Sequence, residues 1–153
     1  MIVELFGISD VDRMRIACDI RTRVFVEEQG VPPDEEWDDH DRTDRDAAHA
    51  LAFGSPGRAV GTGRFYTAEP GTAQIGRLAV LAAARGCGAG SALLEALVAE
   101  ARRRGFARAH LHAQTHARGF YLEHGFHDDG PLLWDAGIEH QPMTKNLARL
   151  NAV

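Results

Sequence analysis

The chain has 153 residues, of which 44% are hydrophobic and 25% are charged, and its formal net charge at pH 7 is −5. This length and composition are those of one ordinary globular domain, which excludes a disordered protein, a collagen and a coiled coil. The negative net charge argues against a protein that binds nucleic acid through its phosphates.

A short strand followed by a helix is predicted at the start of the chain. Ser9 and Asp12 resemble a helix-capping box, and apolar residues then recur at roughly helical spacing as far as Phe25. The segment 29–33 (QGVPP) ends this helix, because proline donates no amide hydrogen and disfavours an α-helical residue before it.

Three strands are predicted in the middle of the chain. Residues 48–53 and 58–66 have strand-like sequences, and the Gly-Ser-Pro-Gly between them has the composition of a turn, so the two should form a hairpin. Residues 74–80 (QIGRLAV) predict the next strand.

The clearest helix covers residues 91–104, which carry a stripe of leucine, valine and alanine before a glycine suited to a left-handed cap. Residues 108–114 then predict a strand, residues 117–124 a short helix, and the tail to Leu147 two more strands. This order of elements predicts an α/β (α+β) domain with helices packed on one central sheet.

The chain shows no repeat or linker, so residues 1–153 are predicted to form a single domain. Its N-terminus, MIVELFGISDV, lacks a basic leader followed by an apolar core, and we expect no membrane partner. Cys18 and Cys87 stand too far apart for a CxxC motif or a disulfide framework. These features predict a reducing, cytoplasmic location.

Charge is concentrated in the acidic segment, residues 34–46, which holds eight carboxylates and two arginines and so has a net charge of −6. A cationic ligand would be favoured near this segment and a polyanionic one in the C-terminal half, which is slightly basic. A solvated acidic loop without a ligand is an equally good interpretation of the segment taken alone.

The glycine loop, residues 85–91 (RGCGAGS), lies between a predicted strand and the clearest helix. Its glycines allow a ligand to approach the backbone, and the free amides of a helix N-terminus favour an anion such as pyrophosphate. A nucleotide-triphosphate loop is excluded, because the only lysine is Lys145, and a GxGxxG fingerprint fails at Ser91 or Leu93. A glycine-rich turn without a ligand remains the alternative.

The loop does fit the pattern of arginine, two residues, glycine, one residue, glycine, at Arg85, Gly88 and Gly90. The stretch RLAVLAAARGCGAGSALLEAL resembles the acyl-CoA signature of the GNAT superfamily of N-acetyltransferases, and FYLEHGF resembles that superfamily's second signature. The stretches IRTRVFVEEQGVPPDEEWDDHD, AQTH and AGIEHQPM are similar to its ElaA-like branch, so the resemblance covers nearly the whole chain.

The resemblance implies a mixed, mostly antiparallel sheet splayed between its fourth and fifth strands, flanked by about four helices, with acetyl-CoA as co-substrate. By position, the edge of the fourth strand would face the pantetheine arm, and the glycine loop would supply amides to the pyrophosphate. The cofactor-binding residues implied are Leu78, Ala79, Val80, Arg85, Gly86, Cys87, Gly88, Ala89, Gly90, Ser91 and Phe120. Cys87 is read as a variable position of the signature rather than a nucleophile.

Tyr121 is similar to the tyrosine that many relatives use as general acid toward the CoA sulfur, and a phenol with a pKa of about 10 is protonated at neutral pH. The general base is less clear, because Gln74 stands where many relatives have a glutamate. Glu27, Glu28 and His49 are the alternatives considered, acting through water.

No metal is predicted, although the chain has eight histidines. His112 and His116 are four residues apart, but the residues between them indicate a strand end, and there is no HExxH motif or carboxylate facial triad.

The sequence thus predicts an N-acetyltransferase that moves an acetyl group from acetyl-CoA to an amine of a small molecule or peptide in a ternary complex. A catalytically weak acyl-CoA-binding sensor or partner module is the alternative that Gln74 keeps open. A dinucleotide-binding redox domain is disfavoured by the broken fingerprint. The acceptor is expected to be cationic, and a homodimer is left open.

Overall fold

The computed structural model describes residues 1–55 and 57–148. The sheet contains β1 (Ile2–Phe6), β2 (Ala48–Gly54), β3 (Arg58–Glu69), β4 (Thr72–Val80), β5 (Arg108–Gln114), β6 (His127–Asp128), β7 (Leu133–Asp135) and β8 (Ile138–Asn146). Its strand order is β1-β2-β3-β4-β5-β8-β6, with β7 also paired to β8. All of these pairings are antiparallel except that of β4 with β5.

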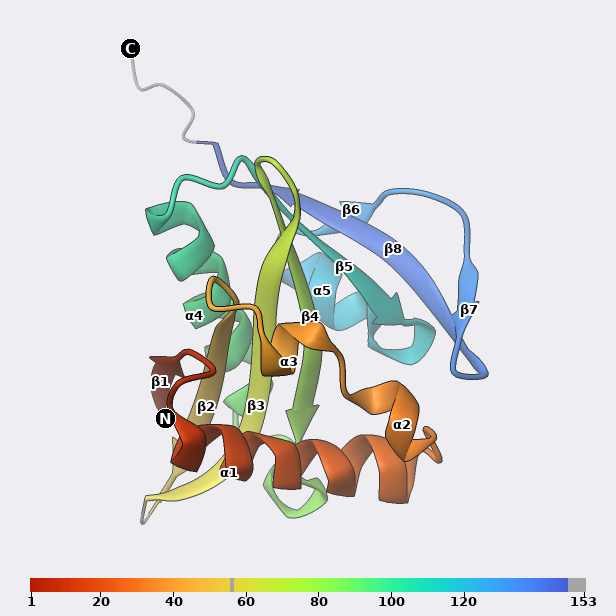
Figure 1. The fold of residues 1–153 in the computed structure, drawn as a ribbon. Helices are drawn as coiled ribbons and strands as arrows, with labels where there is room; N and C mark the ends of the chain where they lie inside the picture. Colours follow the sequence, from red (N-terminus) through yellow and green to blue (C-terminus); the bar gives the residue numbers. More distant parts are fainter. Residues whose placement is uncertain (56, 149–153) are drawn as a thin grey trace.

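The helices are α1 (Val11–Arg21), the π-helix η1 (Thr22–Glu28), α2 (Pro33–Glu36), α3 (Asp39–Arg42), α4 (Ala89–Arg103) and α5 (Arg118–Glu123), with 3-10 turns η2 (Ala82–Ala84) and η3 (Thr115–Ala117). In Figure 1, α1, α2 and α3 lie on one side of the sheet, and α4 and α5 lie on the other. The prediction of a mixed, mostly antiparallel sheet flanked by helices is confirmed.

Successive side chains of a strand point to opposite faces of the sheet, and a hydrophobic core lies on each face. On β2, Ala50 and Ala52 pack in the core beneath α4, whereas Leu51 packs with Ala17 and Ile20 of α1. The α4 core is the larger, and its Leu93, Leu94 and Leu97 are no more than 1% exposed. Burying one such side chain contributes roughly 1.5–3 kcal/mol, so this stripe anchors the helix that the glycine loop opens.

Several predicted boundaries were wrong. The N-cap of α1 is Asp10, whose carboxylate accepts the Arg13 amide at 3.1 Å, and not Ser9. The predicted end of the first helix at Gln29 is confirmed, although its last part, Thr22–Glu28, is a π-helix. Both β4 and α4 begin two residues earlier than predicted. The tail forms three strands rather than two.

The acidic segment is also not a solvated loop, because it folds into α2 and α3 against the sheet.

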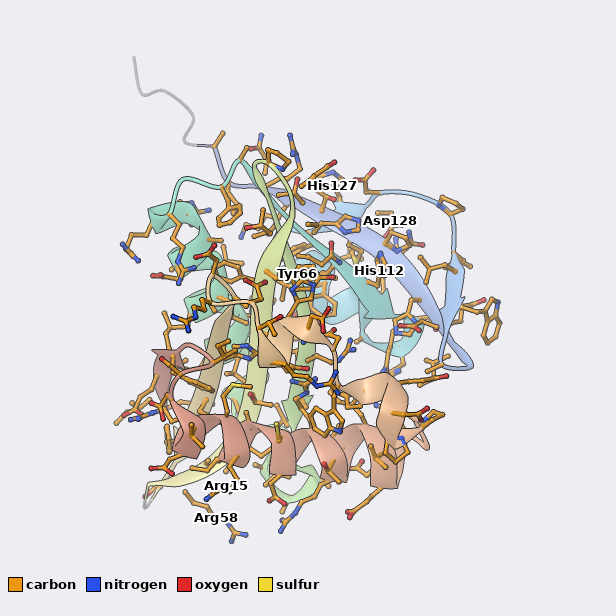
Figure 2. The ribbon with its side chains drawn as sticks, viewed as in Figure 1. Arg15, Arg58, Tyr66, His112, His127 and Asp128 are labelled. Atoms are coloured by element: carbon orange, nitrogen blue, oxygen red, sulfur yellow. The ribbon has the colours of Figure 1, made fainter. Side chains whose placement is uncertain are left out.

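Figure 2 shows the side chains of Tyr66 and His112 in the same half of the molecule as His127 and Asp128 of β6, while Arg15 and Arg58 lie at the opposite end. Within the described residues, no helix is long and apolar enough to cross a membrane.

Candidate active site

The site begins where β4 and β5 separate. The two parallel strands pair only at Thr72 with Arg108, Ala73 with Ala109 and Gln74 with His110, and then diverge. The divergence opens a cavity of about 810 Å³. This fork in the sheet is the splay between the fourth and fifth strands that the resemblance implied.

The cavity connects the two faces of the sheet. Its wall includes Ala117 and Tyr121 from the side of α5, and Arg64 and Tyr66 from the side of α1. Two ligands entering from opposite faces would therefore meet inside the fork. This arrangement can hold two reactants at once.

A β-bulge interrupts β4 at the fork. The pairing with β3 passes from Ala79 opposite Thr62 directly to Gly76 opposite Arg64, which leaves Arg77 and Leu78 outside the ladder. Arg77 has a positive φ of 53°, a conformation that non-glycine residues rarely adopt. β-bulges are common beside binding sites, where they leave backbone groups without a partner in the ladder. Here the two residues outside the ladder, Arg77 and Leu78, line the cavity.

The glycine loop turns from β4 into α4 through two left-handed residues, Gly86 with a φ of 85° and Gly88 with a φ of 90°. Gly88 is the N-cap of α4, so the amides of the first helical turn have no partner inside the helix. Cys87 is exposed, and its amide donates to the Ala84 carbonyl at 3.3 Å. The loop therefore offers helix-terminal amides and the positive end of the helix dipole to an anion.

Four of the eleven residues implied for cofactor binding line the cavity, and the six from Gly86 to Ser91 do not. Leu78, Ala79, Val80 and Arg85 line the cavity, and the glycine loop follows directly from Arg85. Phe120 is not among the residues that line it; its ring lies against the loop, where a Cβ added to Gly90 would sit 3.5 Å from the Phe120 Cζ atom.

Tyr121 reaches the cavity from α5. Its ring lies in an aromatic cluster with Phe120 and Phe126, at centroid distances of 5.1 and 6.0 Å. Burial raises the pKa of Tyr121 to about 12, so the phenol is protonated at neutral pH. Among the described residues no group hydrogen-bonds to its hydroxyl, which leaves this proton available to a ligand in the cavity.

The predicted base residues are mostly outside the site. His49 is 1% exposed on β2, where its ring stacks on Phe6, and Glu27 does not line the cavity. Glu28 does line it, but both of its carboxylate oxygens accept Arg85 Nη2 at 2.9 Å. Arg85 Nε also donates to the Val80 carbonyl at 3.1 Å, so its guanidinium is held against the cavity wall.

Gln74 lies at the fork itself, and its Oε1 atom is 2.9 Å from His110 Nδ1. An amide side chain cannot accept a proton at neutral pH. The position is therefore inside the site but lacks base chemistry.

Three carboxylates of the acidic segment, Glu36, Asp38 and Asp41, form ion pairs with arginines, whereas others such as Glu35 stay exposed. Asp41 accepts Arg21 Nη1 at 2.6 Å and Arg64 Nη1 at 2.7 Å, and these side chains are between 2% and 5% exposed. Burial alone would raise the pKa of Asp41, but its hydrogen bond to Arg21 and the charges of Arg21 and Arg64 hold that pKa well below the usual range. The expectation that the acidic segment favours a cationic ligand therefore fails for Asp41, whose charge is paired with two arginines.

Two neighbouring carboxylates are paired in the same way. Glu36 accepts Arg21 Nε at 2.8 Å and forms an ion pair with Arg77 Nε at 3.1 Å, and Asp38 accepts Arg64 Nη2 at 2.6 Å. This network, which joins α1, α2, α3, β3 and β4, was missed by the sequence analysis. Its sequence signal was Arg64, a charged residue in the interior of strand β3.

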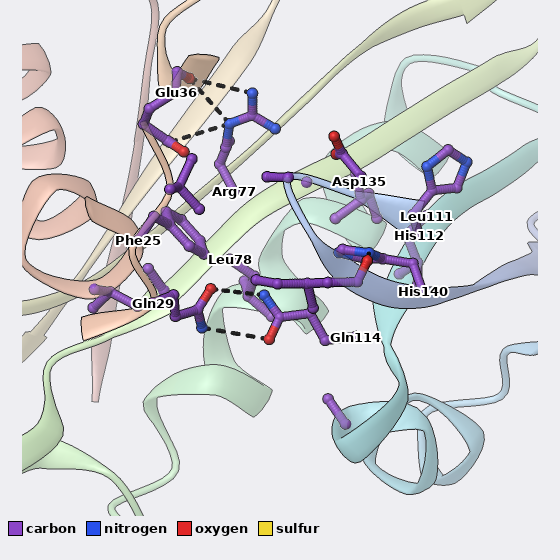
Figure 3. A pocket seen from close by; sticks show the side chains of 18 of the residues that line it. Phe25, Gln29, Glu36, Arg77, Leu78, Leu111, His112, Gln114, Asp135 and His140 are labelled. Carbon is purple, nitrogen blue, oxygen red and sulfur yellow. Dashed lines mark hydrogen bonds and ion pairs between the residues drawn. The ribbon is translucent and has the colours of Figure 1, made fainter. Parts of the chain in front are cut away.

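Figure 3 shows how the walls face one another. Arg77 and Glu36 lie on one wall, and Asp135, His112 and His140 lie on the other. At one side, the Gln29 and Gln114 side chains bridge the walls, with Gln114 Nε2 donating to Gln29 Oε1 at 2.9 Å. Within residues 1–55 and 57–148, no three His, Cys, Asp or Glu side chains are grouped to hold a metal ion.

Comparison with known proteins agrees with this geometry. The sequence model of the acetyltransferase (GNAT) family matches residues 14–126. The chain is 33% identical to the uncharacterized N-acetyltransferase YjcF of Bacillus subtilis (strain 168), over 88% of this chain and 94% of that protein.

Among solved structures, an acyl-CoA N-acyltransferase from Pseudomonas aeruginosa superposes with a TM-score of 0.81 at 26% identity, covering 95% of this chain and 99% of the other. Escherichia coli ElaA superposes with a TM-score of 0.81 and the same coverage at 23% identity, which shows a shared fold.

Proposed function

The chain belongs to the GNAT family of acetyltransferases, and from this premise we propose that it transfers an acetyl group from acetyl-CoA directly to an amine of a small molecule or peptide. The cavity that connects the two faces of the sheet through the fork carries this proposal. It lets the acyl donor enter from the side of α4 and the acceptor from the side of α1, so no covalent acyl-enzyme is needed.

The donor is positioned by backbone groups. The pyrophosphate lies on the amides of Gly86 to Ser91, and the pantetheine arm runs along Leu78 to Val80 toward the bulge. The positive φ at Gly88 and the start of α4 at Ala89 support this placement. The name of the Pseudomonas relative, an acyl-CoA N-acyltransferase, supports an acyl-CoA as donor.

The reaction needs a neutral amine, a donor to the oxyanion and a proton for the thiolate. The amine nitrogen forms a bond to the thioester carbon, and the tetrahedral oxyanion is stabilised by main-chain N–H groups at the bulge. When the carbon–sulfur bond breaks, the electron pair goes to sulfur and Tyr121 supplies the proton that makes free CoA. Its raised pKa keeps Tyr121 protonated until that step.

The acceptor is a cationic compound, although not because of the buried acids. The side chains that line the cavity include five carboxylates and three guanidinium groups, a net charge of −2 with the histidines neutral. Arg64, Arg77 and Arg85 are each paired with an acid. The surplus negative charge therefore comes from exposed Glu35 and Asp135.

Release of free thiol from acetyl-CoA, measured with a panel of mono-, di- and polyamines, tests the proposal, and mass spectrometry of the amine identifies the acetylated product. We expect amine-dependent release with a preference for amines that carry a second positive charge. Tight CoA binding without turnover on any amine would refute the proposal and favour the acyl-CoA-binding module, for which Gln74 is the supporting observation.

A further inference from the structure

Gln74 leaves the proposed reaction without an obvious group to remove the proton from the attacking amine. Other residues lie just past the last pair of β4 and β5 and line the same cavity. Gln74 and His110 form the last pair between β4 and β5. Two residues farther along, on the same face of each strand, stand Gly76 on β4 and His112 on β5. These two are therefore the first residues past the fork on the acceptor face, and both line the cavity.

Gly76 leaves room in front of His112. A Cβ added at Gly76 would meet no atom within 4 Å, and the residue does not have a positive φ. Neither crowding nor backbone conformation therefore explains a glycine in the middle of this strand. The missing side chain provides open space beside the bulge at Arg77, where the thioester carbonyl of the proposed cofactor would lie.

The surroundings of His112 favour a neutral imidazole. Burial lowers the pKa of His112, and the neighbouring rings of His110 and His140 lower it further, whereas Asp135 acts in the opposite direction. The His110 and His112 rings meet edge to face, with centroids 5.2 Å apart. These groups belong to β5, β8 and β7; from β4 the charged residue in the cavity is Arg77, which Glu36 holds.

Three of the five carboxylates on the cavity wall are held in ion pairs and so are less suited to accept a proton, whereas the other two, Glu35 and Asp135, are exposed. Glu28 is bound to Arg85, Glu36 to Arg21 and Arg77, and Asp38 to Arg64. An ion pair stabilises the deprotonated form of each acid and so weakens it as a base. His140 also lines the cavity, but it pairs in register with Gln114, two residues farther from the fork than His112.

We infer that the acceptor nitrogen binds in the space over Gly76 and that His112 is the general base that removes its proton. This inference rests on the proposed function. As the nitrogen bonds to the thioester carbon, its proton passes to the His112 imidazole, and the proton of Tyr121 passes to the departing sulfur. The products are the acetylated amine and free CoA, and solvent returns a proton to Tyr121 and takes one from His112.

The test compares His112→Ala with His127→Ala, using the amine on which the wild type is most active. His127 is exposed on β6 outside the cavity and serves as the matched control (Figure 2). We expect His112→Ala to lower kcat/KM for the amine on the order of 10²- to 10⁴-fold, the usual contribution of a general base. The Kd for CoA should not change, and added imidazole should restore part of the rate.

The pH profile gives a second readout. A protonated imidazole cannot accept a proton, so wild-type kcat/KM should fall as the pH drops through the pKa of His112, and this acid limb should vanish in His112→Ala. Gly76→Ala should raise KM for the amine and leave the Kd for CoA unchanged, because its methyl group fills the acceptor space.

The outcomes separate the two proposals. An active wild type with an equally active His112→Ala variant, or an acid limb that instead disappears in His140→Asn, overturns the assignment of His112 and leaves the proposed function intact. A wild type that transfers acetyl groups to no amine overturns the proposed function and this inference with it.

Discussion

Replacing Asp41 by Asn should destabilise the fold strongly, although the sequence makes Asp41 look like one of many surface acids. The change removes the carboxylate that accepts Arg21 Nη1 at 2.6 Å and Arg64 Nη1 at 2.7 Å. The guanidinium groups of Arg21 and Arg64 are 2% and 3% exposed, so water cannot replace the lost charge. The network of three acids and three arginines would be left with a net charge of +1, and two of its arginines, Arg21 and Arg64, are buried.

Breaking a buried ion pair from one side typically costs about 3–5 kcal/mol, because the remaining charge is left uncompensated. With a urea m-value of about 2 kcal/mol/M, that loss lowers the midpoint of unfolding by roughly 2 M. Equilibrium urea unfolding followed by circular dichroism measures it. Asp39→Asn is the matched control, because Asp39 lies on the same helix, is exposed and forms no ion pair among the described residues.

The pH dependence has a defined sign. The pKa of Asp41 is lower in the folded state than its ordinary value of 3.8. Its contribution is therefore present above about pH 4 and is lost as the pH falls through the folded-state pKa. The difference in unfolding free energy between wild type and Asp41→Asn should be constant from pH 5 to 7 and shrink below about pH 4. An Asp41→Asn variant as stable as Asp39→Asn at pH 7 would refute the buried network.

Three further changes test the site and its support. Tyr121→Phe keeps the aromatic cluster but removes the proton donor, so kcat should fall on the order of 10²- to 10⁴-fold with unchanged Kd for CoA; wild-type turnover, with chemistry limiting the rate, would contradict the general-acid role. Gly88→Val forces a β-branched residue into a left-handed conformation at the N-cap of α4 and should weaken CoA binding measured by calorimetry, and unchanged affinity in the folded variant would contradict the pyrophosphate placement. Leu97→Ala, at a side chain that is 0% exposed, should cost about 2–5 kcal/mol in urea unfolding, and a loss below 1 kcal/mol would argue against the α4 core.

Short sequence patterns were sufficient to predict helix α4, the glycine loop and the family. The leucine stripe and the glycine at its end predicted α4, because burial of one helix face and a left-handed cap are properties of short segments. The glycine loop predicted free amides at a helix start for the same reason, since both left-handed glycines act through their own backbone. The spacing of Arg85, Gly88 and Gly90 with FYLEHGF identified the family, and with it the splayed sheet.

The tertiary structure alone decided which charges are paired and which side chains share the cavity. Sequence counts gave the acidic segment a charge of −6, but Arg21, Arg64 and Arg77 come from elements far away in the chain and neutralise its buried acids. No local pattern encodes such pairs, because they depend on which helix packs over which strand. The same holds for Gly76 and His112, which line one cavity only because β4 and β5 pair for three residues and then part. Residue type and short-range spacing thus determined the elements and the glycine loop, whereas long-range packing determined which ionisable groups are paired and which are not.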